Sequence, residues 1–535
     1  MDFLHSRDFK LDDVGLNVVP KWSYFLYFVV VLLTTKALAS PLWRYVQELK
    51  KGCGSVARLP QLDPFLGLDV ILKMTASLKK HTYLRWLNGL HAEGKSKTIT
   101  FHFLGTKYIH TMESENMKTI FGSSIWKDFQ VSPLRHTNHA TEPFAKQGAA
   151  ITDGQEWEDS RLLIKPYFVR EISANTERLE KHTENLLSHI PKDGSTFDMQ
   201  VLLQRWSHQF LDTSTESLFG ESVGSLQDPQ RAEIAWAMTV VLRGLRLRFL
   251  MVRWLWLFRQ KTWFDAVNFV HAYVDGHIDK AYAQLAEKKQ AAAVNSSSGN
   301  GSTMVIEEQP ERTDLIWSMV KTLGQDRERI RSEMVIIFTP NNDTNSIFIG
   351  NIFWNLARRP DVYAKVREEV LAHGPGAQLT CERLRSMKYL DAVLNETHRL
   401  FPTNITQTRT SMKDTTLPRG GGRDGKLPIY IKKGDVVRVN KNGMFRDKDF
   451  WGQDADEWKP ERWAKLSPSW HFMPFSGGAR RCPAQPQVTT EASYCIAKFA
   501  QRFKAIENRD PNPYMPIIRI TPIHMHGVKI GLIPA

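Results

Sequence analysis

The chain has 535 residues, a formal net charge of +14 and a hydrophobic fraction of 42%, which is the composition of an ordinary folded protein. Its basic residues are dispersed and no nucleic-acid-binding motif is present, so the charge favours a membrane surface or an acidic protein partner and excludes nucleic acid as the expected partner. Four cysteines in this length exclude a disulfide scaffold.

Residues 22–43 predict a single transmembrane anchor. Trp22 to Thr35 carries no charge, and about 20 such residues span a bilayer. A buried helix or a cleaved signal peptide is the alternative, but four acids and three bases precede the run, unlike a basic signal-peptide start. Four basic residues and one acid between Pro41 and Pro60 place the body, residues 44–535, in the cytoplasm and residues 1–21 in the lumen. In a eukaryote, the endoplasmic reticulum is the expected membrane.

The body reads as one mostly α domain with a minor β portion. A Ser/Gly/Asn-rich surface loop is expected at Ala291–Thr303, and the sequons at Asn295 and Asn300 are expected to stay unmodified in a cytoplasmic body. Periodicity predicts helices around Asn268–Lys289, from about Asp314, and over Glu328–Ala357, Asp361–Ala372 and Cys381–Leu400. Short strands are expected at Ile429–Ile431, Val436–Asn440 and near Met515–Ile520.

A loop that contains Gly477 and Gly478 leads to Cys482, and Pro483 then stands in a favourable first helical position. A helix of about twenty residues is expected to run from there to Phe503. A cysteine at a helix N-terminus is biased toward the thiolate by the helix dipole and the free backbone amides. Such a thiolate can ligate iron.

The run Phe475-x-x-Gly478-x-Arg480-x-Cys482 resembles the heme-binding loop of the cytochrome P450 family, with Ala484 where the family usually has glycine. The resemblance implies the mostly α P450 fold for residues 44–535. It also implies a b-type heme with Cys482 as the axial iron ligand, and electrons from NADPH through a separate P450 reductase, because the chain has no flavin or dinucleotide signature.

Three further segments resemble the family and extend what it implies. Glu396-x-x-Arg399, followed by Arg462 in Pro-Glu-Arg-Trp, resembles the Glu–Arg–Arg cluster that clamps the core beneath the heme. Trp157-x-x-x-Arg161 resembles the helix that contacts the heme propionates, a role shared with Arg480. The segments Ile151–Trp157, Asp212–Val223 and Thr416–Gly425 look like the fungal branch that includes alkane and fatty-acid hydroxylases.

Asp343 and Thr344 match the family's acid–alcohol pair, which implies that they handle protons for dioxygen activation. The flanks differ from the family pattern. Pro340 is expected to kink its helix, Asn341 to crowd the distal pocket, and Asn345 replaces the usual second hydroxyl residue.

A further departure concerns the arginine that relatives often place near Thr406 to hold a propionate. Here the nearest arginine is Arg409, three residues further on. On a strand an odd shift changes the face, so that contact is not expected.

These features predict a membrane-bound monooxygenase that oxidises an apolar small molecule. The altered oxygen segment favours tailoring of a fungal secondary metabolite, by hydroxylation or by a radical rearrangement such as desaturation or ring expansion. The branch resemblance favours terminal hydroxylation of fatty acids or alkanes instead. A non-catalytic heme sensor or carrier is the alternative of another class, and it would not need Asp343 or Thr344.

Overall fold

The structure is a computed structural model that describes residues 21–136, 140–174, 176–205, 215–223, 233–257, 260–297 and 312–535. Its α-helices are α1 Lys21–Lys50, α2 Leu68–Lys79, α3 Tyr83–Glu93, α4 Ser114–Gly122, α5 Ser132–Arg135, α6 Gly154–Ala174, α7 Thr176–Ser188, α8 Met199–Arg205, α10 Glu233–Leu250, α11 Lys261–Ser297, α12 Leu315–Leu323, α13 Arg327–Arg358, α14 Pro360–Leu371, α15 Cys381–Ser386, α16 Lys388–Leu400, α17 Lys441–Met444, α18 Lys448–Trp451 and α19 Gln485–Arg502.

The strands form one large sheet and three small ones. Six strands pair in the order β1-β2-β3-β9-β6-β4: Ala57–Arg58, Thr98–Phe103, Thr106–Thr111, Val436–Asn440, Thr406–Ser411 and Phe129–Gln130. The three-stranded sheet orders β10, β13 and β5: Phe503–Asn508, Lys529–Pro534 and Phe197–Asp198. The two-stranded sheets are β7–β8, Thr415–Gly421 and Leu427–Ile431, and β11–β12, Pro516–Ile518 and Pro522–His524. The prediction of a mostly α fold with a minor β portion is confirmed.

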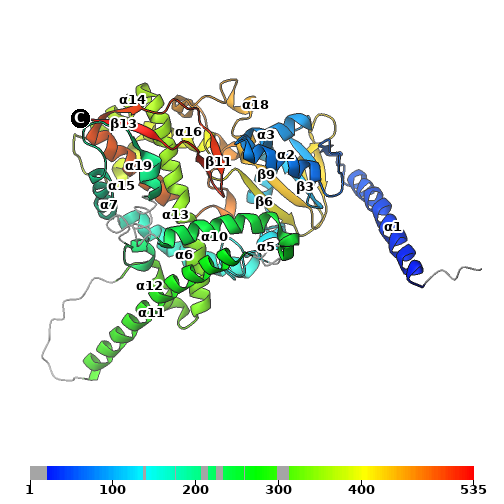
Figure 1. Ribbon diagram of the computed structural model, residues 1–535, viewed down its shortest axis with the longest axis horizontal. Coiled ribbons are helices and arrows are strands. Elements are labelled where there is room, and N and C mark those ends of the chain that lie inside the picture. Colours follow the sequence, from blue (N-terminus) through cyan, green and yellow to red (C-terminus); the bar gives the residue numbers. More distant parts are fainter. Residues whose placement is uncertain are drawn as a thin grey trace, which may run out of the picture.

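One long helix, α13, organises the core. The second half of α13 packs with α14, α16 and α19 in one buried hydrophobic cluster, and its first half packs with α10, α11 and α12 in another. Figure 1 shows α13 inside the helical body, with the large sheet at the end nearer α1. The helix that carries the predicted oxygen-activating residues therefore joins the two halves of the core.

Two predicted helix boundaries were wrong. Helix α11 continues to Ser297, through the first half of the expected loop, because its run of three alanines favours helix. The helix predicted over Cys381–Leu400 is two helices, α15 and α16, separated at Met387. Residues 298–311, which include Asn300, and residues 212–214 of the branch motif lie outside the described residues.

Helix α1 covers the segment predicted as a membrane anchor and extends away from the body, at the end opposite the C-terminus (Figure 1). Among the described residues, none of the helices combines the length and apolar character needed to cross a bilayer. The anchor at 22–43 is therefore not confirmed and stays a prediction. The luminal segment predicted at residues 1–21 lies, apart from Lys21, outside the described residues.

Candidate functional site

The predicted metal ligand, Cys482, lies in a tight loop just before α19. Its backbone N–H donates to the carbonyl oxygen of Phe475 at 2.9 Å, which closes the loop. The helix begins at Gln485 with Ala484 as its N-cap, so Pro483 is not the first helical residue as predicted. Pro486 takes the place in the first turn, where a missing N–H is tolerated.

The environment of the Cys482 thiol contains opposing effects. Burial raises the pKa of this thiol, while the backbone N–H groups of Ala484 and Gln485 and the charges of Arg161 and Lys441 act to lower it. Burial prevails, so the helix terminus alone does not produce the expected thiolate. A bound metal cation replaces the thiol proton, and the two amides then stabilise the thiolate ligand.

Gly478 allows the Cys482 loop to pack directly on α4. Its φ is +64°, and a Cβ at this position would lie 1.8 Å from the carbonyl oxygen of Phe121. Both the backbone conformation and the close approach require glycine. The structure thus gives Gly478 a packing role between the loop and α4.

Arg480 and Trp157 are brought together by the loop and α6. The guanidinium carbon of Arg480 lies 4.7 Å from the Trp157 ring centre, and Nη2 donates to Asp153 Oδ1 at 2.5 Å and to the Thr152 carbonyl oxygen at 2.6 Å. The buried Nε of Arg480 has no partner among the described residues. One donor of this arginine therefore remains available for an anion.

Arg480 belongs to a cluster of cations that sequence reasoning missed. The other members are Arg135, Arg409 and Lys441. Arg409 on β6 is 5% exposed, and burial together with the charges of Arg135 and Arg480 lowers its pKa to about 9. Lys441 is fully buried, and burial and the Arg409 charge lower its pKa to about 7. Arg409 therefore lies close enough to Arg480 for their charges to interact, although its position on the strand did not favour a place at this site. The sequence feature that could have indicated Arg409 is an arginine within a Thr-rich strand. No sequence feature indicated Lys441.

This cation cluster, defined as Arg135, Arg409, Lys441 and Arg480, carries more positive than negative charge. Asp153 is the carboxylate that acts on it among the described residues, and buried like charges persist only when anions compensate them. Arg161 on α6 is half-buried and close enough to act on Cys482, and no protein carboxylate pairs with it in the described part of the chain. The two propionates of a b-type heme supply the missing negative charge, so the residues present fit that group.

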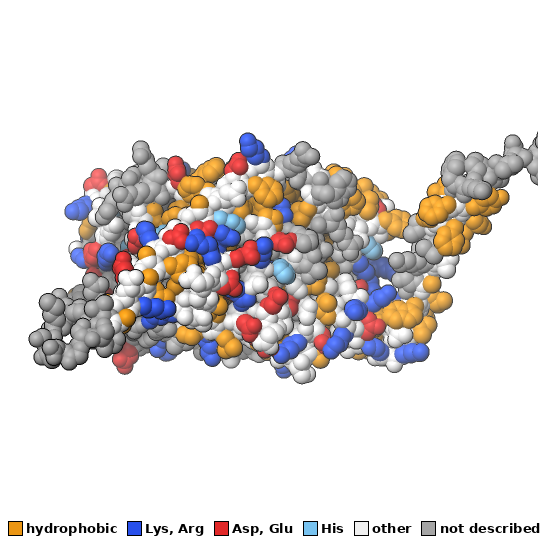
Figure 2. Space-filling view, turned by 90° about the horizontal axis from the view of Figure 1, so that it is seen from below, with side chains coloured by type: hydrophobic (Ala, Val, Ile, Leu, Met, Phe, Trp, Pro, Cys, Tyr) orange, Lys and Arg blue, Asp and Glu red, His pale blue; other side chains and the backbone are white. Residues whose placement is uncertain are grey.

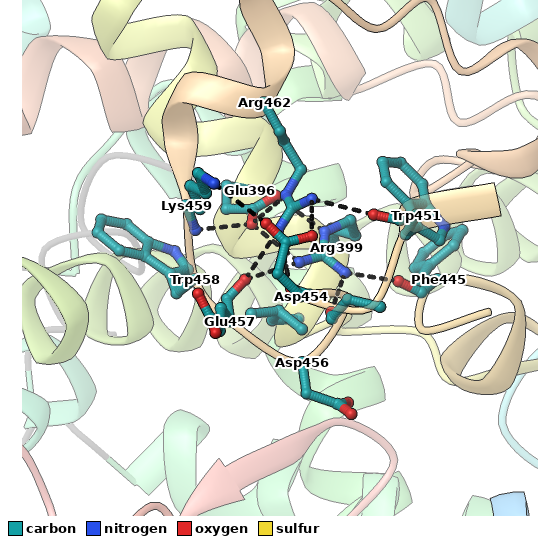
Figure 3. Close-up of polar contacts among 12 residues, drawn as sticks. Glu396, Arg399, Phe445, Trp451, Asp454, Asp456, Glu457, Trp458, Lys459 and Arg462 are labelled. Carbon is teal, nitrogen blue, oxygen red and sulfur yellow. Dashed lines mark hydrogen bonds and ion pairs between the residues drawn. The ribbon is translucent and has the colours of Figure 1, made fainter. Parts of the chain in front are cut away.

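The predicted structural trio meets in one buried network beneath this region (Figure 3). Arg399 donates to both oxygens of Glu396 at 2.8 Å, and Arg462 Nε donates to Glu396 Oε1 at 2.9 Å. The remaining Arg399 donors bond to backbone carbonyl oxygens of residues 445, 455 and 457. Glu396 and Arg399 are fully buried. Their bonds join α16 to the chain on both sides of α18.

Helix α13 continues through Pro340, and Thr344 lies one turn further on. The hydroxyl of Thr344 donates to the Pro340 carbonyl oxygen at 2.7 Å. The side chains of Asp343 and Asn341 lie outside the described residues. Asn345, which replaces the usual second hydroxyl residue, is buried and turned toward α19.

A cysteine before the buried helix α19, with the cation cluster beside it, is the arrangement expected of a heme–thiolate protein. A profile of the family "Cytochrome P450" matches residues 73–524. The cytochrome P450 monooxygenase apdE of Emericella nidulans is 50% identical over 508 residues, covering 95% of this chain and 94% of the relative. The cytochrome P450 monooxygenase iccC of Talaromyces variabilis is 48% identical over 485 residues, covering 91% and 93%.

The chain belongs to the cytochrome P450 family and is a P450 monooxygenase. The iliC monooxygenase of a Neonectria species, 45% identical over 482 residues, covers 90% of this chain and 92% of its own length. None of these relatives is described as an alkane or fatty-acid hydroxylase, so the expected branch is not supported.

Proposed function

We propose that this P450 tailors an apolar secondary metabolite in a fungus, with electrons that come from NADPH through a separate reductase. The observation that carries the proposal is Cys482 at the start of α19 beside the buried cation cluster. The high identity to P450 monooxygenases of three fungal genera supports the fungal setting. The basic net charge of +14 supports docking to an acidic reductase face.

Each site residue has a role that follows from its position. A b-type heme, when bound, supplies the iron on which dioxygen is activated. Cys482 ligates that iron, and the amides of Ala484 and Gln485 hold the thiolate. Arg161 and the cation cluster hold the propionates, while Trp157 stacks against Arg480 and fixes its orientation. Thr344, with Asp343 beside it in sequence, holds and passes protons at its hydroxyl oxygen.

The reaction outcome has two candidates, simple hydroxylation and a radical rearrangement such as desaturation or ring expansion. Asn345 faces α19, which weakens its use as an argument for rearrangement and leaves Pro340 and Asn341 as the motive. Turnover under ¹⁸O-labelled dioxygen separates the two. Complete incorporation of label into the product supports hydroxylation, and an oxidised product without label supports rearrangement. A fatty acid or alkane that is oxidised faster than other apolar substrates would favour the alternative substrate class.

A non-catalytic heme sensor shares Cys482 but does not need a proton-handling hydroxyl. The variant Thr344→Ala therefore distinguishes the two classes. In a monooxygenase we expect NADPH consumption to continue while product falls. Unchanged product formation would remove Thr344 from the proposed chemistry.

The test of the site itself is the absorption spectrum of the reduced, carbon-monoxide-bound protein, with Cys482→Ala beside the wild type. A red-shifted Soret band that disappears in the variant is expected from thiolate ligation. A spectrum of the histidine-ligated type in the wild type would overturn the assignment of Cys482.

A further inference from the structure

Asn345, which departs from the family pattern, makes an unusual buried contact. It is 1% exposed, directly follows Thr344 on α13, and its Nδ2 donates to Glu491 Oε2 on α19. Gln487, one turn before Glu491, donates to the other carboxyl oxygen at 2.9 Å. Gln487 and Glu491 are each 5% exposed. Two amide groups thus enclose one carboxyl group between the two helices.

An ionised Glu491 carboxylate would leave buried hydrogen-bond acceptors of this cluster without donors. Asn345 Oδ1 and Gln487 Oε1 are buried, and neither has a donor among the described residues. A carboxylate only accepts hydrogen bonds, so it leaves both carbonyl oxygens unsatisfied. A protonated carboxyl has one O–H donor, so after rotation of one amide group it accepts from one amide and donates to the carbonyl oxygen of the other, which leaves one of the two oxygens unsatisfied instead of both.

The charges around Glu491 act in opposite directions. Burial raises the pKa of Glu491, while the hydrogen bond from Gln487, the guanidinium of Arg178 on α7 and the hydrogen bond from Asn345 act to lower it. Tyr167 on α6 also faces this region, and burial raises its pKa to about 12, so its phenol is neutral. Burial prevails at Glu491, in agreement with the two unsatisfied carbonyl oxygens.

We propose that Glu491 is a neutral carboxylic acid in the folded protein, and that its acid–amide pair with Asn345 positions the Thr344 turn of α13 against α19. Helix α19 follows Cys482, so this pair links the helix behind the metal ligand to the turn that handles protons. Glu491 and Asn345 are positioning residues that act through Thr344. The functional consequence rests on the proposed role of Thr344, whereas the protonation state does not.

Infrared spectroscopy tests the protonation state without any substrate. The C=O stretching band of a protonated carboxyl lies apart from the amide bands and shifts in D₂O. We expect a band in the wild type at pH 7 that is lost in Glu491→Gln. Glu333 on α13 is the control, because burial raises the pKa of this carboxyl too although it pairs with Arg329 at 3.0 Å, and Glu333→Gln should leave the band assigned to Glu491 in place. No band that is lost with Glu491 would overturn the proposal.

An isosteric exchange tests the pairing. Glu491→Gln keeps a neutral pair and should retain the product formed per NADPH within about twofold. Asn345→Asp places two carboxyl groups against each other and should lower the product formed per NADPH about fivefold. The double variant Asn345→Asp/Glu491→Gln exchanges acid and amide, and should recover most of the loss. A double variant as poor as Asn345→Asp, or a Glu491→Gln variant with an equal loss, would contradict the acid–amide pair. If neither Thr344→Ala nor the Asn345 and Glu491 variants change the product formed per NADPH, while the infrared band is present, only the proposed function of Thr344 is contradicted. The protonation state of Glu491 then still stands.

Discussion

At the scale of single residues, buried charge is the recurring feature of the site. In the cation cluster positive charges repel one another until an anion enters, and that requirement indicates the heme propionates. In the Glu396 network the charges are already matched, because Arg399 and Arg462 both bond to Glu396 and Arg462 also pairs with Asp454. Buried arginines therefore favour binding of a cofactor in the cation cluster, whereas in the Glu396 network they stabilise the core.

Glu396→Gln should strongly destabilise the fold. The change leaves Arg399 and Arg462 buried beside a neutral amide, and breaking a buried ion pair costs about 3–5 kcal/mol. Denaturant unfolding of the heme-bound protein measures the loss. Lys365→Ala is the matched control, because it removes the exposed ion pair with Glu461, where about 0–1 kcal/mol is expected. Equal losses in the two variants would mean that burial does not govern these pairs.

His398 predicts a pH dependence of stability. Its ring stacks 3.7 Å from that of Phe348 and lies edge-on to Phe475 of the Cys482 loop, and burial lowers its pKa to about 3. The unfolded chain, with a histidine pKa near 6.5, binds the proton more readily, so this contribution is complete above pH ~6.5 and is lost as pH falls toward 3. We expect His398→Phe to flatten the decrease in unfolding free energy between pH 6.5 and 4, measured in parallel with the wild type. Parallel pH profiles for the two proteins would contradict it.

At the scale of elements, α13 carries the largest local conflict. Pro340 lacks the N–H that would bond to the carbonyl oxygen of Ile336, and its ring crowds that turn. Thr344 donates to the Pro340 carbonyl oxygen, so the hydroxyl proposed to handle protons is held by the turn that begins at the proline. The helix persists because both of its halves are packed in hydrophobic clusters.

Pro340→Ala should therefore stabilise the fold and impair coupling. Restoring the helical bond is expected to raise the free energy of unfolding by about 1–3 kcal/mol. The same change moves the Thr344 turn, so product per NADPH should fall. The control Pro360→Ala lies in the first turn of α14, where proline is tolerated, and should change stability by less than about 1 kcal/mol. Loss of stability in Pro340→Ala would show that the kink is a packing requirement.

Sequence predicted most helices because their apolar periodicity is strong, and it placed Cys482, Glu396 and Arg399 because each lies in a short motif. It did not predict the cation cluster, because Arg135, Arg409 and Lys441 come from separate elements that meet only in the fold. It missed the Glu491–Asn345 contact for the same reason. Ser297 as the end of α11 was missed because Ser and Asn composition favours a loop, while the preceding alanines sustain the helix.

At the scale of the whole molecule, α1 differs from the body it joins. Tyr24, Phe25, Tyr27 and Phe28 are each more than 60% exposed. Figure 2 shows hydrophobic side chains gathered on this projecting helix, whereas charges of both signs are mixed on the visible face of the body. An exposed apolar surface of this kind marks an interaction site. We therefore propose that α1 holds the protein on a lipid membrane, with endoplasmic reticulum and a cytoplasm-facing body as the expected setting.

Replacing Phe25, Tyr27 and Phe28 with glutamine should release the protein from lipid vesicles, measured by co-sedimentation of the full chain. The carbon-monoxide spectrum should not change, because α1 projects from one end of the body and α19, the helix after Cys482, lies toward the other end (Figure 1). A matched control replaces three exposed apolar residues of the body, Leu162, Leu427 and Met525, with glutamine. Vesicle binding that survives the α1 changes but not the control changes would place the membrane contact on the body.

The pairing of β3 with β9 has a consequence for synthesis on the ribosome. Tyr108 and Val436 are register partners in parallel strands, although roughly 330 residues separate them along the chain. At about 5–20 residues per second, β3 waits roughly 15–65 s before its neighbour is translated. During that time its unpaired edge is a template for other strands, so expression yield should depend on chaperones that shield nascent β-strands until the C-terminal third emerges.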